Sequence, residues 1–125
     1  MNQNIINQYS ISFQNRVDNW DIFGKEINKI ITTNNKYLTS FLISWNSVEQ
    51  INNSLLPDIN QALISPNIEV DSDSATVDII MFNNLVDFYD DSNGYVNSIP
   101  LQDFKEIVTG WRDFLKTLPL GGSKV

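Results

Sequence analysis

The sequence predicts an α+β fold: a single domain in which an antiparallel β-meander packs against amphipathic helices. The middle of the chain contains β-branched and aromatic runs separated by turn residues, whereas flanking segments carry apolar residues at helical spacing. These strand and helix signals are grouped along the chain and do not strictly alternate. Grouped signals favour helices that cover one face of an antiparallel sheet.

The length of 125 residues fits one domain, residues 1–125, and the 42% hydrophobic composition supplies a core. The chain has no cysteine, which excludes disulfides, thiolate metal sites and cysteine nucleophiles. Residues 1–8 lack the features of a signal peptide, and no apolar run is long enough to span a bilayer. We therefore expect a cytoplasmic protein whose flexible parts are residues 1–8 and 121–125.

The first third of the chain predicts one strand and one ambiguous segment. Tyr9–Phe13 alternates apolar and polar residues with a period of two, which indicates a half-buried strand. Residues 19–31 fit a helix capped by Asp18, and they equally fit a hairpin that turns at Gly24-Lys25. The sequence leaves this choice open.

Two helices are predicted next. After a break at residues 32–35, apolar side chains recur at helical spacing at Tyr37, Leu38, Phe41, Leu42 and Trp45. Ser47 begins a second helix, whose apolar positions extend to Leu63. Pro57 lies inside this helix and has no backbone N–H, so we expect a kink or a short break there.

The meander is predicted from strand runs and turn residues. Residues 75–82 and 85–90 are separated by Asn83-Asn84, and asparagine tolerates the positive φ that a two-residue hairpin turn requires. A second turn at Asp91–Gly94 contains Asn-Gly and returns the chain through Tyr95–Ile99. These segments form three antiparallel strands.

A final amphipathic helix is predicted over Leu101–Leu118. It begins after Ser98 and Pro100, and Pro119 ends it. Its apolar positions follow helical spacing: Leu101, Phe104, Ile107, Val108, Trp111, Phe114, Leu115 and Leu118. We expect Trp111 to pack inward.

Negative charge is concentrated in one region. The chain has 15 acidic and 8 basic residues, and the stretch between Tyr37 and Phe104 contains ten acidic residues and no Lys, Arg or His. A field of one sign repels phosphate backbones and attracts cationic partners. We therefore expect a basic protein partner and no direct binding of nucleic acid.

The candidate partner-binding residues are carboxylates of this region and the tyrosines that flank its acidic turn: Glu69, Asp71, Asp73, Asp87, Tyr89, Asp90, Asp91 and Tyr95. The alternative interpretation is that these carboxylates are solvated turn and strand-end residues that keep the protein soluble. Exposed tyrosines would be natural anchors of a protein interface.

The register of the meander supports the first interpretation. Counting back from Asn83-Asn84, Phe82 faces Leu85, Asp78 faces Tyr89, and Ile80 faces Asp87. The carboxylates of Asp78 and Asp87 would then be diagonal neighbours on the sheet. Like charges so close cost stability, and a protein tolerates that cost more readily when a cationic partner binds there.

Metal and catalytic sites lack the residues that they need. Asp90–Gly94 resembles the start of a calcium loop, but Tyr89 and Pro100 then occupy the positions of the first Asp and the last Glu. Without His or Cys, zinc has no usual ligands, and Ser-His-Asp and Cys-His arrangements cannot form. We expect no metal, no cofactor and no enzymatic activity; a pair of carboxylates is the enzymatic alternative.

One part of the chain resembles a known class of proteins. The hairpin-rich segment Ala75–Ile99, the Ile99-Pro-Leu-Gln-Asp-Phe104 connection and a helix with Trp111-Arg-Asp-Phe-Leu115 resemble the small acidic immunity proteins of bacterial polymorphic toxins and contact-dependent inhibition systems. The resemblance covers about a third of the chain. It implies a cytoplasmic inhibitor without enzymatic activity that binds a cognate toxin domain and blocks its active site.

No family site residue carries over, because immunity proteins have no catalytic residues and their toxin-binding positions vary. The acidic charge favours a basic toxin, such as a nuclease, whose groove carboxylates can occupy. The alternative is a structural or assembly protein that forms a homo-oligomer and whose acidic surface only confers solubility. The sequence leaves the oligomeric state open.

Overall fold

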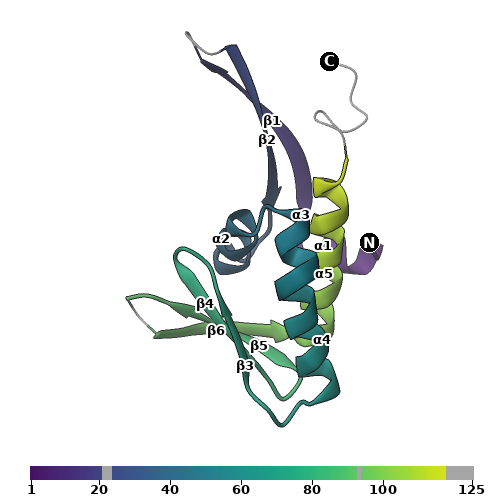
Figure 1. Ribbon diagram of the computed structural model, residues 1–125, viewed down its shortest axis with the longest axis vertical. Helices are drawn as coiled ribbons and strands as arrows, with labels where there is room; N and C mark the ends of the chain where they lie inside the picture. Colours follow the sequence, from purple (N-terminus) through teal and green to yellow (C-terminus); the bar gives the residue numbers. More distant parts are fainter. Residues whose placement is uncertain (21–23, 93, 118–125) are drawn as a thin grey trace.

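The computed structural model describes residues 1–20, 24–92 and 94–117 and has the predicted α+β fold (Figure 1). A two-stranded hairpin and a four-stranded antiparallel sheet lie at opposite ends of the molecule, with helices between them. The elements in chain order are α1 (Gln3–Tyr9), β1 (Ser12–Trp20), β2 (Gly24–Thr32), α2 (Lys36–Ser44), α3 (Val48–Gln50), the π-helical η1 (Ile51–Leu55), α4 (Leu56–Ile64), β3 (Val70–Asp73), β4 (Val77–Phe82), β5 (Leu85–Asp90), β6 (Gly94–Pro100) and α5 (Leu101–Leu115).

Helix α1 lies at the start of the chain, where the sequence predicts flexibility for residues 1–8. The Asn2 side chain caps it by accepting a hydrogen bond from a backbone N–H of the first turn at 2.7 Å. Ser10 ends the helix with a left-handed φ of 51°. The strand predicted from Tyr9 begins at Ser12 instead, because Tyr9 is the last residue of α1.

Tyr9 is buried and connects α1 to α5. Its Oη donates a hydrogen bond to the Asp103 carboxylate at 2.6 Å. Burial raises the pKa of Tyr9, and the hydrogen bond and the charge of Asp103 raise that pKa further. The phenol therefore keeps its proton above pH of about 10, at which an exposed tyrosine ionises.

Residues 19–20 and 24–31 belong to the two strands of a β-hairpin, so the helical alternative is wrong for this part of the chain. β1 and β2 pair antiparallel along their whole length, with Trp20 opposite Gly24. Gly24 is the first residue of β2 and not part of a turn, and residues 21–23 lie outside the described part of the chain. Strand β2 is rich in β-branched isoleucine, which packs better on a pleated sheet than along a helix.

The base of the hairpin packs against α5, and the rest of it projects away from the body (Figure 1). Ile31 is buried, and the Phe13 ring stacks on Trp111 and Phe114 with centroid distances of 6.2 and 5.2 Å. The Lys29 ammonium lies 4.4 Å from the centre of the Phe114 ring. Aromatic stacking and a cation–π contact thus hold the ribbon to the helix.

The two helices predicted after residue 35 are confirmed. Asn35 caps α2, and Ser47 caps α3 by accepting a hydrogen bond from a backbone N–H at 3.2 Å. Near Pro57 the helix changes its pitch without breaking, because the Leu56 N–H bonds to the carbonyl of Ile51, five residues back. This π-helical turn carries the helix past a proline that has no N–H to donate.

The four-stranded sheet, in the order β3-β4-β5-β6, contains the predicted meander and adds the unpredicted edge strand β3 (Figure 1). Asn83 and Asn84 join β4 to β5 with φ values of 53° and 64°, as a two-residue hairpin turn requires. The predicted register is confirmed: Phe82 faces Leu85, Asp78 faces Tyr89, and Ile80 faces Asp87.

This turn gives a first testable prediction. Replacing Asn84 by glycine should raise the free energy of unfolding by about 0.5–1 kcal/mol, because glycine adopts positive φ without steric cost. Replacing Asn84 by valine should lower it by about 1–2 kcal/mol, because a β-branched side chain clashes with its own backbone there. Urea denaturation measures both, and a valine variant as stable as the natural protein would contradict the assigned turn.

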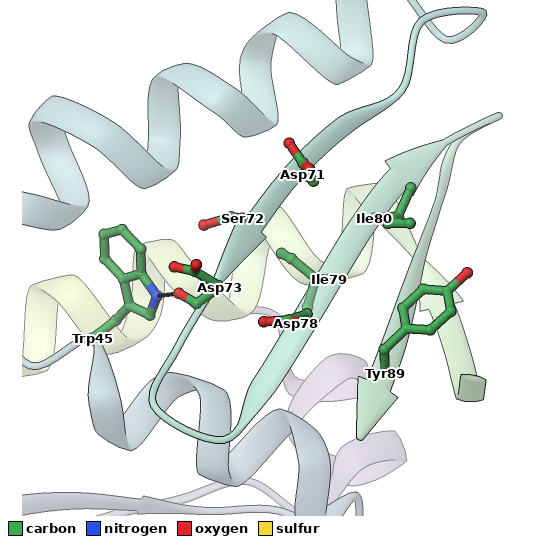
Figure 2. A pocket seen from close by; sticks show the side chains of 8 residues that line it. All are labelled: Trp45, Asp71, Ser72, Asp73, Asp78, Ile79, Ile80 and Tyr89. Atoms are coloured by element: carbon green, nitrogen blue, oxygen red, sulfur yellow. Dashed lines mark hydrogen bonds between the residues drawn. The ribbon is translucent and has the colours of Figure 1, made fainter. Parts of the chain in front are cut away.

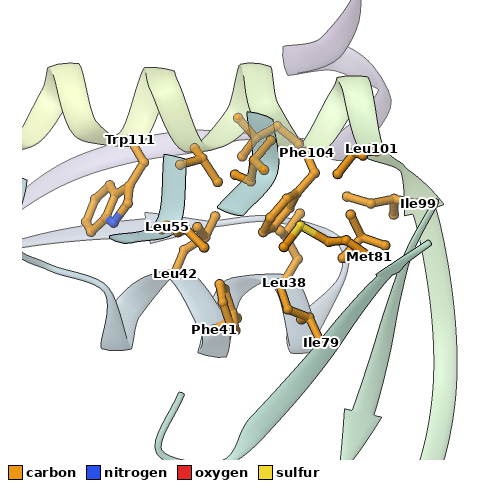
Figure 3. Packing of buried hydrophobic residues seen from close by; sticks show 14 of the residues in the cluster. Leu38, Phe41, Leu42, Leu55, Ile79, Met81, Ile99, Leu101, Phe104 and Trp111 are labelled. Carbon is orange, nitrogen blue, oxygen red and sulfur yellow. The ribbon is translucent and has the colours of Figure 1, made fainter. Parts of the chain in front are cut away.

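The hydrophobic core lies between the helices and the inner face of the sheet (Figure 3). Alternate strand residues supply the sheet side: Val70, Val77, Ile79, Met81, Val86, Phe88 and Ile99. Helix α5 supplies Leu101, Phe104, Ile107, Val108 and Trp111. Trp111 is fully buried, as predicted. The helix ends at Leu115, and Leu118 and residues 121–125 lie outside the described part of the chain.

Candidate functional site

The outward side of the four-stranded sheet collects four of the carboxylates. Because inward-facing residues of these strands are buried, their neighbours in sequence point outward. Two rows of paired residues cross the sheet on that side. One row is Asp73, Asp78, Tyr89 and Tyr95, and the other is Asp71, Ile80, Asp87 and Ser98. We call this surface the acidic face, defined by Asp71, Asp73, Asp78 and Asp87.

Two carboxylates of the acidic face oppose each other directly. Asp73 at the end of β3 pairs with Asp78 near the start of β4, and both are exposed. Like charges opposite each other in an antiparallel pair destabilise it, by up to about 1 kcal/mol. Among the described residues, the lining around this pair includes no Lys or Arg, so negative charge is concentrated there.

A hollow of about 600 Å³ lies in front of these strands (Figure 2). Its lining combines carboxylates with aromatic and aliphatic groups: Trp45, Asp71, Ser72, Asp73, Asp78, Ile79, Ile80 and Tyr89. The Trp45 Nε1–H donates a hydrogen bond to the Asp73 carbonyl at 2.9 Å, which fixes the indole against the end of β3. Aromatic groups on two sides and carboxylates between them suit a cationic side chain.

A chain of hydrogen bonds holds the other end of the acidic face. Ser98 Oγ donates to the Asp87 carboxylate at 2.5 Å, so the Tyr95 hydroxyl, 2.8 Å from Ser98 Oγ, is the donor in that second bond. The Tyr95 ring also packs edge-on against Tyr89, with 5.9 Å between centroids. Tyr95 is thus fixed in place although 56% of its surface is exposed. A rigid exposed tyrosine loses little entropy when a partner covers it.

Asp90 and Asp91 lie away from the acidic face. Asp90 is opposite the buried Val77, on the other side of the sheet from Asp78, and its carboxylate accepts a hydrogen bond from the Ser92 N–H at 2.8 Å. A separate hollow of about 410 Å³ contains both, lined by Lys36, Tyr37, Ser40, Thr76, Val77, Asp90, Asp91 and Ser92. For Asp90 the alternative interpretation, a residue that stabilises its turn, therefore fits the contacts observed.

The other predicted residues lie on or beside the acidic face. The structure brings together Asp71, Asp73, Asp87, Tyr89 and Tyr95. Glu69 is exposed and directly precedes β3. The sequence-based candidates omitted Asp78, although its place in the register put it on this side, and Trp45, whose contact with β3 has no signal in the sequence.

Asp58 on α4 is a further neighbour that the sequence-based candidates omitted. Burial raises the pKa of Asp58, and the negative charge of Asp71 raises that pKa further. A carboxyl whose pKa is higher in the folded than in the unfolded state stabilises the fold below the unfolded pKa, and this contribution is lost as the pH rises through the folded pKa. At neutral pH the ionised Asp58 therefore costs stability.

Replacing Asp58 by asparagine should consequently stabilise the protein at pH 7. The expected gain is a few tenths of a kcal/mol, because solvent partly screens this half-buried group. Thermal unfolding at pH 7 and at pH 3 measures it, and Asp91→Asn, at an exposed turn residue, is the control. A gain that persists at pH 3, where the Asp58 carboxyl is protonated, would show that ionisation of Asp58 is not its cause.

No three His, Cys, Asp or Glu side chains converge to hold a metal ion within residues 1–20, 24–92 and 94–117. None of the helices in that part of the chain has the length and apolar character needed to cross a bilayer. No family model, curated protein or solved structure matches this chain.

Proposed function

We propose that this protein is an immunity protein without enzymatic activity, which binds and neutralises a cognate bacterial toxin domain in the cytoplasm. The acidic face would contact a basic surface of the toxin. The observation that carries the proposal is the arrangement of Asp71, Asp73, Asp78 and Asp87 on one side of a sheet whose residues, 68–100, include no Lys or Arg.

The lining of the face supports a protein as its partner. Tyr89 and Tyr95 stand among the carboxylates, and Trp45 closes one side of the hollow. Aromatic side chains are enriched at protein interfaces, where their large apolar surface can be covered and their polar atom can still bond. Carboxylates between them provide the charge that selects a basic surface.

A nuclease is the class of toxin that fits this charge. Enzymes that grip nucleic acid do so with lysine and arginine, and those residues form the groove that must be free for activity. A rigid array of carboxylates can occupy such a groove in place of phosphates. Binding there would block the substrate without any chemistry by the inhibitor.

The proposal is tested by capturing the binding partner of the protein and assaying that partner for toxicity. The tagged protein is captured from its native host at low salt, and bound proteins are eluted at about 1 M salt, where charges are screened beyond about 3 Å. A basic protein should elute, arrest growth when expressed alone, and be harmless when this chain is expressed with it.

A homo-oligomer is the competing result. If only copies of this chain are recovered, or if the eluted protein arrests growth equally with and without this chain, the proposed function is wrong. Sedimentation of the purified protein alone distinguishes these two outcomes, because self-association appears there without any partner.

A further inference from the structure

Exposed apolar side chains extend the acidic face at one end. Phe82 and Leu85 oppose each other across the Asn83-Asn84 turn and share the strand side of Asp78 and Asp87, and Leu85 also faces Pro100. Phe82 is 40% and Leu85 41% exposed. We call Phe82, Leu85 and Pro100 the apolar row.

The connection between α4 and β3 adds further apolar surface at the same end. The Asn83 N–H donates to the Pro66 carbonyl at 2.8 Å, which ties this connection to the hairpin turn. Ile64 and Ile68, on either side of Pro66, are 81% and 55% exposed. The solvated face of an antiparallel sheet normally carries polar residues, so grouped apolar residues there indicate a surface that a partner covers.

The spacing between apolar and acidic groups follows from strand geometry. Phe82 lies four residues from Asp78 along β4, and each strand residue advances about 3.3 Å, so about 13 Å separates them. The row of Asp71 and Asp87 lies between these two ends. Along one direction the surface thus changes from apolar to acidic within the length of about nine helical residues.

Charge decides which occupant fits. A second copy placed face to face would oppose four carboxylates with four more, which is unfavourable. A purely apolar ligand would leave those carboxylates desolvated and unpaired. A basic segment that also carries apolar side chains satisfies both parts of the surface.

We infer that the partner binds through an amphipathic segment, with Lys or Arg over the acidic rows and apolar side chains, about 13 Å further along, over the apolar row. The inference rests on the proposed function and specifies its partner: a basic surface alone is not sufficient. Carboxylates select the partner by charge, and the apolar row supplies contacts that salt does not weaken.

Two synthetic peptides test this inference on the full-length protein. The first is a helical peptide of about 18 residues with arginines in its first two turns and leucine and phenylalanine on the same face of its last two turns. The second keeps the arginines and has serine at the apolar positions. Each is titrated into the isotope-labelled protein, and the amide NMR signals give the site and the affinity.

The amphipathic peptide should bind about tenfold more tightly and shift the signals of both Phe82 and Asp78, whereas the serine peptide should shift Asp78 only. Replacing Phe82 and Leu85 together by serine should remove the tenfold difference. Ile43→Ser, at an exposed isoleucine of α2, is the matched control and should leave the difference unchanged. Both variants alter exposed side chains, and unchanged signals elsewhere verify their folds.

The possible failures are distinguishable. Equal affinities for the two peptides would overturn the inference and leave the proposed function standing. If neither peptide binds, both are overturned, because the acidic face then does not attract cations. Shifts of Phe82 and Leu85 that grow with protein concentration in the absence of peptide would overturn the inference in favour of a second copy.

Discussion

Trp111→Ala is expected to lower the free energy of unfolding by about 3–5 kcal/mol, a large share of the about 5–15 kcal/mol that is typical of a folded domain. Trp111 is fully buried and lies where three parts of the chain meet. Its ring stacks on Phe13 of the hairpin and on Phe114, and its Nε1–H donates a hydrogen bond to the Trp45 carbonyl at 2.8 Å. Alanine would leave a cavity and an unpaired carbonyl.

Trp111→Phe separates the contribution of ring packing from that of the hydrogen bond. Phenylalanine keeps an aromatic ring against Phe13 but cannot bond to the Trp45 carbonyl, so we expect a loss of about 1–3 kcal/mol. Urea denaturation followed by far-UV circular dichroism measures both variants. A loss below about 1 kcal/mol for Trp111→Ala would contradict the packing described for α5, because fully buried tryptophan is rarely removed at so small a cost.

Asp73→Asn with Asp78→Asn is expected to weaken binding of the basic partner by about 10- to 100-fold at low salt. These two carboxylates oppose each other across β3 and β4 and line the same hollow. Removing them eliminates the strongest concentration of negative charge on the acidic face, and the loss of one close charge pair, worth about 1.5 kcal/mol, already weakens binding about tenfold. The variant should fold normally, because it relieves a like-charge contact.

Asp90→Asn with Asp91→Asn is the matched control, since it removes the same charge from the turn that faces α2. We expect this variant to bind nearly as well as the natural protein. Calorimetry at low and at about 1 M salt measures both pairs, and their difference should shrink as salt screens the charges. Equal weakening by the two pairs would mean that overall charge, and not the acidic face, determines binding.

The meander could be predicted because its signals are local. Asn83-Asn84 fixes the turn, and counting from the turn gives the register, so the diagonal placement of Asp78 and Asp87 followed directly. β3 was missed because its four residues, Val70–Asp73, include one apolar side chain and read as an acidic loop. Pairing with β4, and not local propensity, makes that segment a strand.

The hairpin remained ambiguous for a different reason. Its apolar residues, among them Ile27, Ile30 and Ile31, fit a helical face as well as a strand. What decides the structure is pairing with β1 and the contact of Phe13 with Trp111, a residue 98 positions later in the chain. Such long-range contacts override the local spacing of apolar residues, and that spacing does not reveal them.

The candidate site was predictable in part. Alternation along β5 placed Asp87 and Tyr89 on one side, whereas Asp90, a candidate chosen for its proximity in sequence, belongs to the opposite side of the sheet. One residue along a strand reverses the direction of a side chain, so neighbours in sequence need not be neighbours in space. Trp45, directly after α2, belongs to the site because its indole N–H donates a hydrogen bond to the Asp73 carbonyl at the end of β3. Only the folded structure brings these two groups together.

The location of the sheet at one end of the molecule affects how the protein meets a partner (Figure 1). Residues 68–100 contain seven acidic residues and no Lys or Arg, which equals the net charge of −7, so the rest of the chain is neutral overall. A charge displaced to one end of an elongated body gives the molecule a permanent dipole. In the field of a cationic surface the sheet end turns toward that surface before contact, and such orientation raises association rates by about 10- to 1,000-fold at low salt. The charge of the sheet thus acts before contact, because it sets the orientation in which the two molecules collide.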